Sequence, residues 1–146
     1  NTLMTDRKLI IILYGLLILM LYIIYNDLLL FTKDGMEDTA EKAVRDAISK
    51  SGYEDLELRR ISEYHCPRDW NQDDKEVLTL HCSASALFTD GTSAEVSIEQ
   101  KEFRKPHADR SGREYMRPYK IIFSVTIQEL GPDCQGEASI SRIINI

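Results

Sequence analysis

The stretch "EVLTLHCSASALFTDGTSAEVSIEQKEF" (residues 76–103) carries the strongest fold signal in the chain. Apolar residues alternate with polar residues on both sides of a central Thr-Asp-Gly sequence (residues 89–91). Alternation with a period of two is typical of half-buried strands, and the residues between the two runs are typical of a turn. The stretch therefore predicts an antiparallel β-hairpin.

The register of this hairpin depends on the length of its loop. A two-residue loop would set apolar residues against polar ones, whereas a three-residue loop pairs Ala86 with Ala94 and Cys82 with Ile98. Only the three-residue loop keeps one face of the hairpin apolar. It needs a left-handed third residue, which Gly91 supplies.

An amphipathic helix is predicted upstream by "DGMEDTAEKAVRDAISKSGY" (residues 34–53). Asp34 is suited to the N-cap, and Gly52 to the position after the helix. We expect the helix to lie on the sheet, either as a continuation of the preceding apolar segment or after a hinge at residues 33–35. Small and apolar residues recur at helical spacing on one face: Met36, Ala40, Ala43, Val44, Ala47 and Ile48. Because these side chains are small, whatever packs on them comes close.

Three further segments predict strands. The pattern is strong in "YKIIFSVTIQEL" (residues 119–130), weaker in "EDLELRRISEY" (residues 54–64), where alternation slips near Arg59-Arg60, and short in "EASISRIINI" (residues 137–146). The expected fold class is α+β: an N-terminal transmembrane helix, then an amphipathic helix packed on a four- to five-stranded antiparallel sheet.

The N-terminal run "RKLIIILYGLLILMLYIIYNDLLLF" (residues 7–31) is apolar on all sides. It is long enough to span a bilayer with tilt, and no small-residue cleavage site follows it, which favours a retained transmembrane helix over a signal peptide. Arg7 and Lys8 precede it, so we expect a cytoplasmic N-terminus. Residues 1–33 then form a cytoplasmic stub and transmembrane helix, and residues 34–146 an extracytoplasmic domain.

Three residues of this segment are candidates for packing against other membrane helices. Gly15 would let another backbone approach, and Asn26 and Asp27 are costly near lipid unless they have partners. The alternative is that Gly15 is incidental and Asn26-Asp27 mark the edge of the membrane.

Charge and motifs restrict the function. The net charge is −6, and residues 1–33 sum to +1, so the domain carries −7. An acidic domain argues against nucleic acid and against a flat anionic membrane as the main partner. We recognise no catalytic set, phosphate loop or cofactor motif, and we expect a protein that is not an enzyme and binds no cofactor or metal.

The three cysteines allow one disulfide in an extracytoplasmic domain. Cys66 and Cys134 both lie near prolines in turn-like segments and are the predicted pair, with Cys82 buried and reduced. A zinc site formed with His65 and His81 is disfavoured, because adjacent strand residues point to opposite faces.

Residues 104–118, "RKPHADRSGREYMRP", lack periodicity and are predicted to form a long charged loop. Such a loop is either a solvated linker or a contact surface. The partner-contact candidates in it are Arg104, His107, Arg110 and Tyr115. A further candidate is Trp70, in the separate segment "CPRDWNQDD" (residues 66–74), which either folds over the edge of the domain or anchors a partner.

A retained apolar helix, its continuation "AEKAVRDAISKSGY" (residues 40–53) and a small antiparallel sheet resemble pilin-like proteins, and are most similar to minor pseudopilins of the TadE kind. The resemblance covers the whole chain as architecture. Thr5 stands where pilins usually carry Glu, so no functional residue is transferred. The resemblance implies a structural subunit of a pilus-like or cell-envelope assembly, located in the cell membrane or a surface filament. Its partners would be lipid and other membrane or pilus subunits.

The alternative is a single-pass accessory subunit of a secretion system, transporter or receptor, which binds a partner through residues 104–118.

Overall fold

The computed structural model describes residues 2–53, 55–68 and 75–142. It confirms the α+β class, with two helices and a five-stranded antiparallel sheet. The elements are α1 (Thr2–Leu30), α2 (Lys33–Lys50), β1 (Leu58–His65), β2 (Val77–Phe88), β3 (Ser93–Ala108), β4 (Glu114–Thr126), the 3₁₀ turn η2 (Gln128–Leu130) and β5 (Gln135–Ser141).

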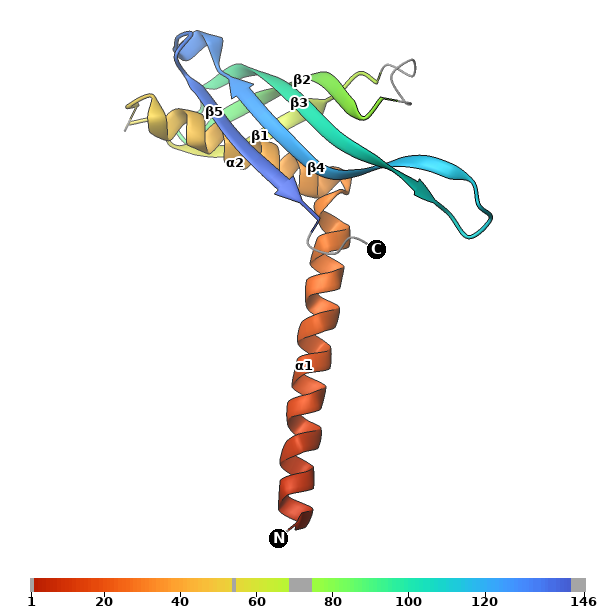
Figure 1. Ribbon diagram of the computed structural model, residues 1–146. Helices are drawn as coiled ribbons and strands as arrows, with labels where there is room; N and C mark the ends of the chain where they lie inside the picture. Colours follow the sequence, from red (N-terminus) through yellow and green to blue (C-terminus); the bar gives the residue numbers. More distant parts are fainter. Residues whose placement is uncertain (1, 54, 69–74, 143–146) are drawn as a thin grey trace.

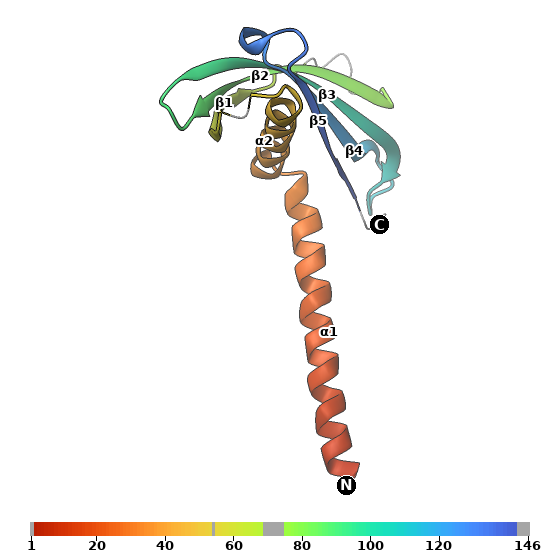
Figure 2. The ribbon, with the colours of Figure 1, turned by 90° about the vertical axis from the view of Figure 1, so that its left-hand side faces the viewer.

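The five strands lie in the order β1-β2-β3-β4-β5, so each strand pairs with its neighbour in sequence. The sheet curls around α2, which lies against its concave face, and the convex face is left uncovered (Figure 2). α1 leaves the domain on the concave side as a separate rod (Figure 1). Residues Asp6–Asn26 of α1 are long and apolar enough to cross a membrane, and none of them is buried within the protein.

The predicted register of the central hairpin is confirmed. Ala86 pairs with Ala94, and Cys82 pairs with Ile98. Gly91 has a φ of 89°, which is the left-handed conformation that the three-residue loop requires. The pattern of alternation therefore determines the register, because a slip by one residue would expose the whole apolar row.

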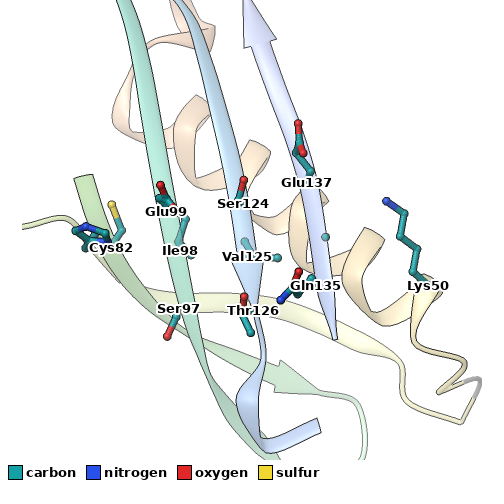
Figure 3. A pocket seen from close by; sticks show the side chains of 12 residues that line it. Lys50, Cys82, Ser97, Ile98, Glu99, Ser124, Val125, Thr126, Gln135 and Glu137 are labelled. Carbon is teal, nitrogen blue, oxygen red and sulfur yellow. The ribbon is translucent and has the colours of Figure 1, made fainter. Parts of the chain in front are cut away.

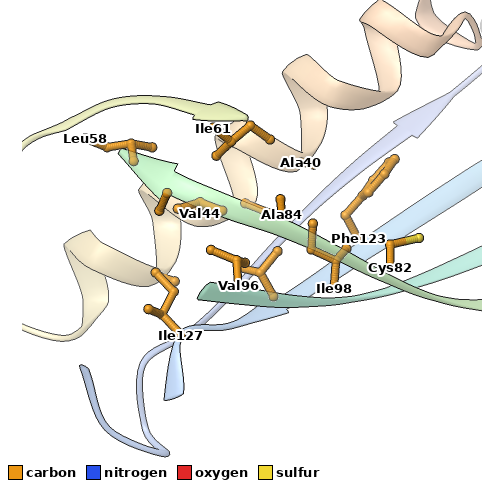
Figure 4. Packing of buried hydrophobic residues seen from close by; sticks show 14 of the residues in the cluster. Ala40, Val44, Leu58, Ile61, Cys82, Ala84, Val96, Ile98, Phe123 and Ile127 are labelled. Atoms are coloured by element: carbon orange, nitrogen blue, oxygen red, sulfur yellow. The ribbon is translucent and has the colours of Figure 1, made fainter. Parts of the chain in front are cut away.

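The hydrophobic core lies between α2 and the sheet (Figure 4). The predicted face of α2 is confirmed, since Ala40, Val44 and the other small residues are buried. They pack with fully buried residues of β4 and the following turn such as Phe123 and Ile127. Burying a side chain such as Val or Phe contributes about 1.5–3 kcal/mol, which makes this interface the main source of stability.

The connection between the helices differs from the prediction. The N-cap of α2 is Thr32 rather than Asp34, because the Thr32 hydroxyl accepts a hydrogen bond from the Gly35 amide (3.3 Å). The same hydroxyl donates to the Leu29 carbonyl (2.6 Å), so Thr32 ends one helix and begins the next. The two helices form a corner there and not one continuous rod (Figure 1).

β1 is irregular, as its slipping alternation indicates. Its pairing with β2 shifts register between Leu58 and Arg60, and again between Ser62 and His65. Arg45 of α2 donates a hydrogen bond to the Leu58 carbonyl (3.0 Å) at the first shift. A bulge turns successive side chains away from strict alternation, which explains the weak sequence signal.

The predicted disulfide is wrong. Cys66 bonds to Cys82, with 4.2 Å between their Cα atoms, and Cys134 is the free, buried cysteine. The reason is the order of the strands. Cys66 follows β1, which pairs with β2, whereas Cys134 precedes β5 at the opposite edge of the sheet. Cys82 still faces the core, because Cys66 approaches it from the same inner side.

Candidate functional site

Residues 104–118 form a projecting β-hairpin rather than the predicted loop, and we call them the arm. β3 continues to Ala108 and β4 starts at Glu114, with Lys105 opposite Arg117 and His107 opposite Tyr115. The arm extends beyond the part of the sheet that covers α2 (Figure 1). Both of its faces are therefore largely outside the core, so no apolar alternation marks its strands.

The tip of the arm is held by Asp109. Its carboxylate accepts hydrogen bonds from the Ser111 amide (2.9 Å), the Ser111 hydroxyl (2.6 Å) and the Arg113 amide (2.9 Å). These bonds, the Ser111 hydroxyl first, lower the pKa of Asp109 below its usual value. Gly112 takes a φ of 82° and completes the turn. The tip thus has a defined conformation at neutral pH.

Side chains also couple the two strands of the arm. The His107 and Tyr115 rings meet edge to face, with 5.5 Å between their centroids. The Lys105 ammonium lies 4.6 Å from the centroid of the Tyr119 ring. Cross-strand aromatic pairs and cation–π contacts of this kind stabilise a hairpin that lacks a core of its own.

Arg142 connects the base of the arm to the corner between α1 and α2. Its guanidinium lies over the ring of Phe31, which directly follows α1, 4.4 Å from the centroid. Its Nε donates to the Pro118 carbonyl (2.8 Å), and its backbone amide donates to the Tyr119 carbonyl (2.9 Å). The base of the arm is therefore held against the corner from which α1 leaves the domain.

The predicted contact residues divide into two groups. Arg110 and Tyr115 are exposed on the arm, and His107 is half-buried against Tyr115. Arg104 is buried and donates to the Lys75 carbonyl (2.9 Å), so its role is structural and its prediction as a contact residue is wrong. Trp70 lies outside the described residues.

Sequence reasoning missed a row of buried polar side chains on β3. Gln100, Glu102 and Arg104 continue the inward-facing positions of Val96 and Ile98 toward the arm. The signal was available, because these residues keep the same alternation as the apolar ones. It was overlooked because polar residues are seldom expected on an inward face.

Tyr64 of β1 contacts the first residue of this row, Gln100. The Tyr64 hydroxyl donates to Gln100 Oε1, and Gln100 Nε2 donates to Glu102 Oε1 (3.1 Å). Burial raises the pKa of Tyr64 well above its usual value, and the charges of Glu102 and Glu37 raise it further. Tyr64 therefore stays protonated and remains a donor throughout the physiological range.

We expect Tyr64→Phe to lower the free energy of unfolding by about 1 kcal/mol, because the buried Gln100 Oε1 then loses the hydroxyl that donates to it. Urea unfolding followed by circular dichroism measures the change. Tyr115→Phe, on the exposed arm, is the matched control and should be close to neutral. Equal losses in the two variants would mean that the buried hydrogen bond contributes nothing specific.

The convex face of the sheet carries a shallow depression of about 700 Å³. Figure 3 shows that Ser97, Ser124 and Thr126 line it from neighbouring strands, with Glu99 and Glu137 beside them. These hydroxyls and carboxylates offer hydrogen bonds to a partner surface. Among residues 2–53, 55–68 and 75–142, no group of three or more His, Cys, Asp or Glu side chains is placed to hold a metal ion.

Two histidines considered for zinc adjoin the disulfide cysteines. Because Cys66 and Cys82 are bonded to each other, neither supplies a thiolate to a metal.

Comparison of the chain with protein-family models, with curated protein sequences and with solved structures found no match.

Proposed function

We propose that this protein is a single-pass membrane subunit of a pilus-like or cell-envelope assembly, similar to minor pseudopilins. α1 would anchor the chain and pack against other subunits, and the domain would make lateral contacts outside the membrane. One observation carries the proposal. None of the apolar side chains of residues 6–26 is buried within the protein, and lipid or other apolar helices would cover this surface.

Gly15 supports packing as well as anchoring. A Cβ atom built on Gly15 meets nothing within 4 Å, so no contact within this chain requires a glycine at this position. Small residues in membrane helices let a neighbouring helix approach closely. The backbone of Asn26 and Asp27 continues α1, and the side chain of Asp27 lies outside the described residues.

The orientation follows from charge. Arg7 and Lys8 precede the apolar window, and the acidic domain follows it. The positive-inside rule then supports a cytoplasmic N-terminus and an extracytoplasmic domain. A disulfide such as Cys66–Cys82 also suits an oxidising compartment.

The test is whether co-purification of partner subunits depends on the particular side chains of α1 or only on the apolar character of the helix. We expect replacement of residues 9–25 by leucine, and separately Gly15→Leu and Asp27→Leu, to leave the protein in the membrane after a carbonate wash. We expect each to reduce co-purification of partner subunits, because lipid tails do not discriminate between apolar side chains whereas a packed helix does. Leu19→Ile, which keeps size and apolarity, is the control.

The open convex face of the sheet favours a second candidate, an accessory subunit that binds a partner through its domain. Ser124→Arg places a large charge in the middle of that face. Loss of partners with Ser124→Arg, together with full co-purification of the leucine version, would favour the accessory subunit and contradict assembly through α1.

A further inference from the structure

We propose that the arm binds the anionic lipid headgroups of the same bilayer that holds α1. This inference rests on the proposed membrane anchoring of α1. It concerns a different part of the chain, and it assigns residues 104–118 a ligand of defined chemistry, the phosphate groups of acidic phospholipids.

The first observation is the charge of the arm. Residues 104–118 contain five basic and two acidic residues, a net charge of +3, in a chain with a net charge of −6. The remainder of the chain therefore carries −9. Arg104 is buried at the base of the arm, so residues 105–118, which the arm can present to a ligand, sum to +2. The overall acidity of the domain therefore does not exclude an anionic partner, because the net charge averages a basic projection with an acidic body. An anionic membrane attracts the first and repels the second.

The second observation is the position of the arm. In both views it descends on the side of the domain from which α1 leaves, and its tip is level with the domain end of α1 (Figures 1 and 2). The contacts of Arg142 with Phe31 and with the Pro118 carbonyl hold the arm in this place. A bilayer around residues 6–26 would thus have its surface close to the tip.

The third observation is the kind of side chain that the arm presents. Arg110 and Arg113 are exposed at the tip, and Lys105 is exposed on the strand behind it. Tyr115 is 46% exposed beside them. Tyrosine is enriched where membrane and water meet, and basic side chains interact with lipid phosphates at that depth. Tyr22 and Tyr25 of α1 are exposed near the same end of the helix.

These observations define a second support for the domain. α1 alone would let the domain rotate and tilt at the membrane, whereas a basic arm on the lipid surface fixes one orientation. The convex face of the sheet then points away from the bilayer, where other proteins can reach it. Because the attraction is electrostatic, it weakens as salt is added.

The test uses the full chain in lipid nanodiscs. Ala108→Cys carries a donor dye on the exposed end of β3 beside the tip, where it leaves the contacts of Asp109 intact, and Glu95→Cys, on the open face of β3, carries the same dye as the matched control. Cys134 is buried and stays unlabelled. Energy transfer to acceptor-labelled lipid is compared in discs of phosphatidylcholine alone and in discs with added phosphatidylglycerol. Retention of the chain in the discs is measured separately.

We expect roughly twofold more transfer from position 108 when phosphatidylglycerol is present, and a loss of that gain in high salt. The double substitution Arg110→Glu and Arg113→Glu should abolish the gain, and position 95 should not respond to the lipid. Equal transfer from position 108 in both lipids, in a chain retained in the discs, would overturn the lipid contact of the arm alone. A chain that does not stay in the discs would overturn the membrane anchoring of α1 first.

Discussion

Replacing Gly136 by alanine should destabilise the domain by about 3 kcal/mol, at the upper end of the usual cost of inserting a methyl group into a packed interface. A Cβ atom on Gly136 would overlap the Ala43 carbonyl oxygen and the Ala47 amide nitrogen, and would lie 2.8 Å from Ala47 Cα. All three are backbone atoms of α2, so no side chain can rotate to make room. The helix itself would have to move away from β5.

The surrounding contacts oppose that movement. Asp46 of α2 accepts a hydrogen bond from the Glu137 backbone amide (3.1 Å), which holds the helix to the residue next to Gly136. Ala47 is fully buried, and its carbonyl contacts the buried Cys134 sulfur at 3.7 Å. Lifting α2 from β5 would break these contacts together with the core beneath them.

Urea unfolding of the Gly136→Ala variant measures the loss. Ser139→Ala, on the exposed face of the same strand, is the control and should change the free energy of unfolding by less than about 0.5 kcal/mol. Ala47→Gly should not rescue Gly136→Ala, because the overlap involves backbone and not the Ala47 methyl group. A stability equal to that of the parent protein would contradict the close approach of helix and strand.

Removing the disulfide by Cys66→Ala and Cys82→Ala together should also cost about 3 kcal/mol, the value expected for closing a loop of this size. The bond joins residues 16 positions apart in sequence. It constrains the irregular end of β1 against β2, next to the register shift between Ser62 and His65. Without the bond, the conformational entropy of the unfolded chain rises, and this lowers the free energy of unfolding.

Reductant provides the control for this prediction. It should lower the stability of the parent protein to that of the double variant and leave the double variant unchanged. Peptide mapping without reductant should link Cys66 to Cys82, and Cys134 should react with thiol reagents only after unfolding. A linked peptide that contains Cys134 would contradict the pairing.

The sequence by itself determined the features that depend on neighbours along the chain. The period of two between residues 78 and 98 determined the hairpin and its register, because one slipped residue would expose every apolar side chain. The small-residue face of α2 determined that the helix lies close against the sheet. The apolar stretch of α1 is evident from composition alone.

Only the tertiary structure decided the features that depend on segments far apart in sequence. Cys66 bonds to Cys82 because β1 and β2 are adjacent, and no spacing of cysteines contains the order of strands. Residues 104–118 form a hairpin because the pairing of β3 with β4 continues past the core, where backbone hydrogen bonds leave no apolar pattern. Arg142 contacts both Phe31 and the Pro118 carbonyl, so the C-terminal segment, the connection between the helices and the base of the arm meet there. No local pattern in the sequence predicts that these three segments are neighbours. Local periodicity indicates which face of a helix or strand is buried. Packing and strand order determine which other segment covers that face.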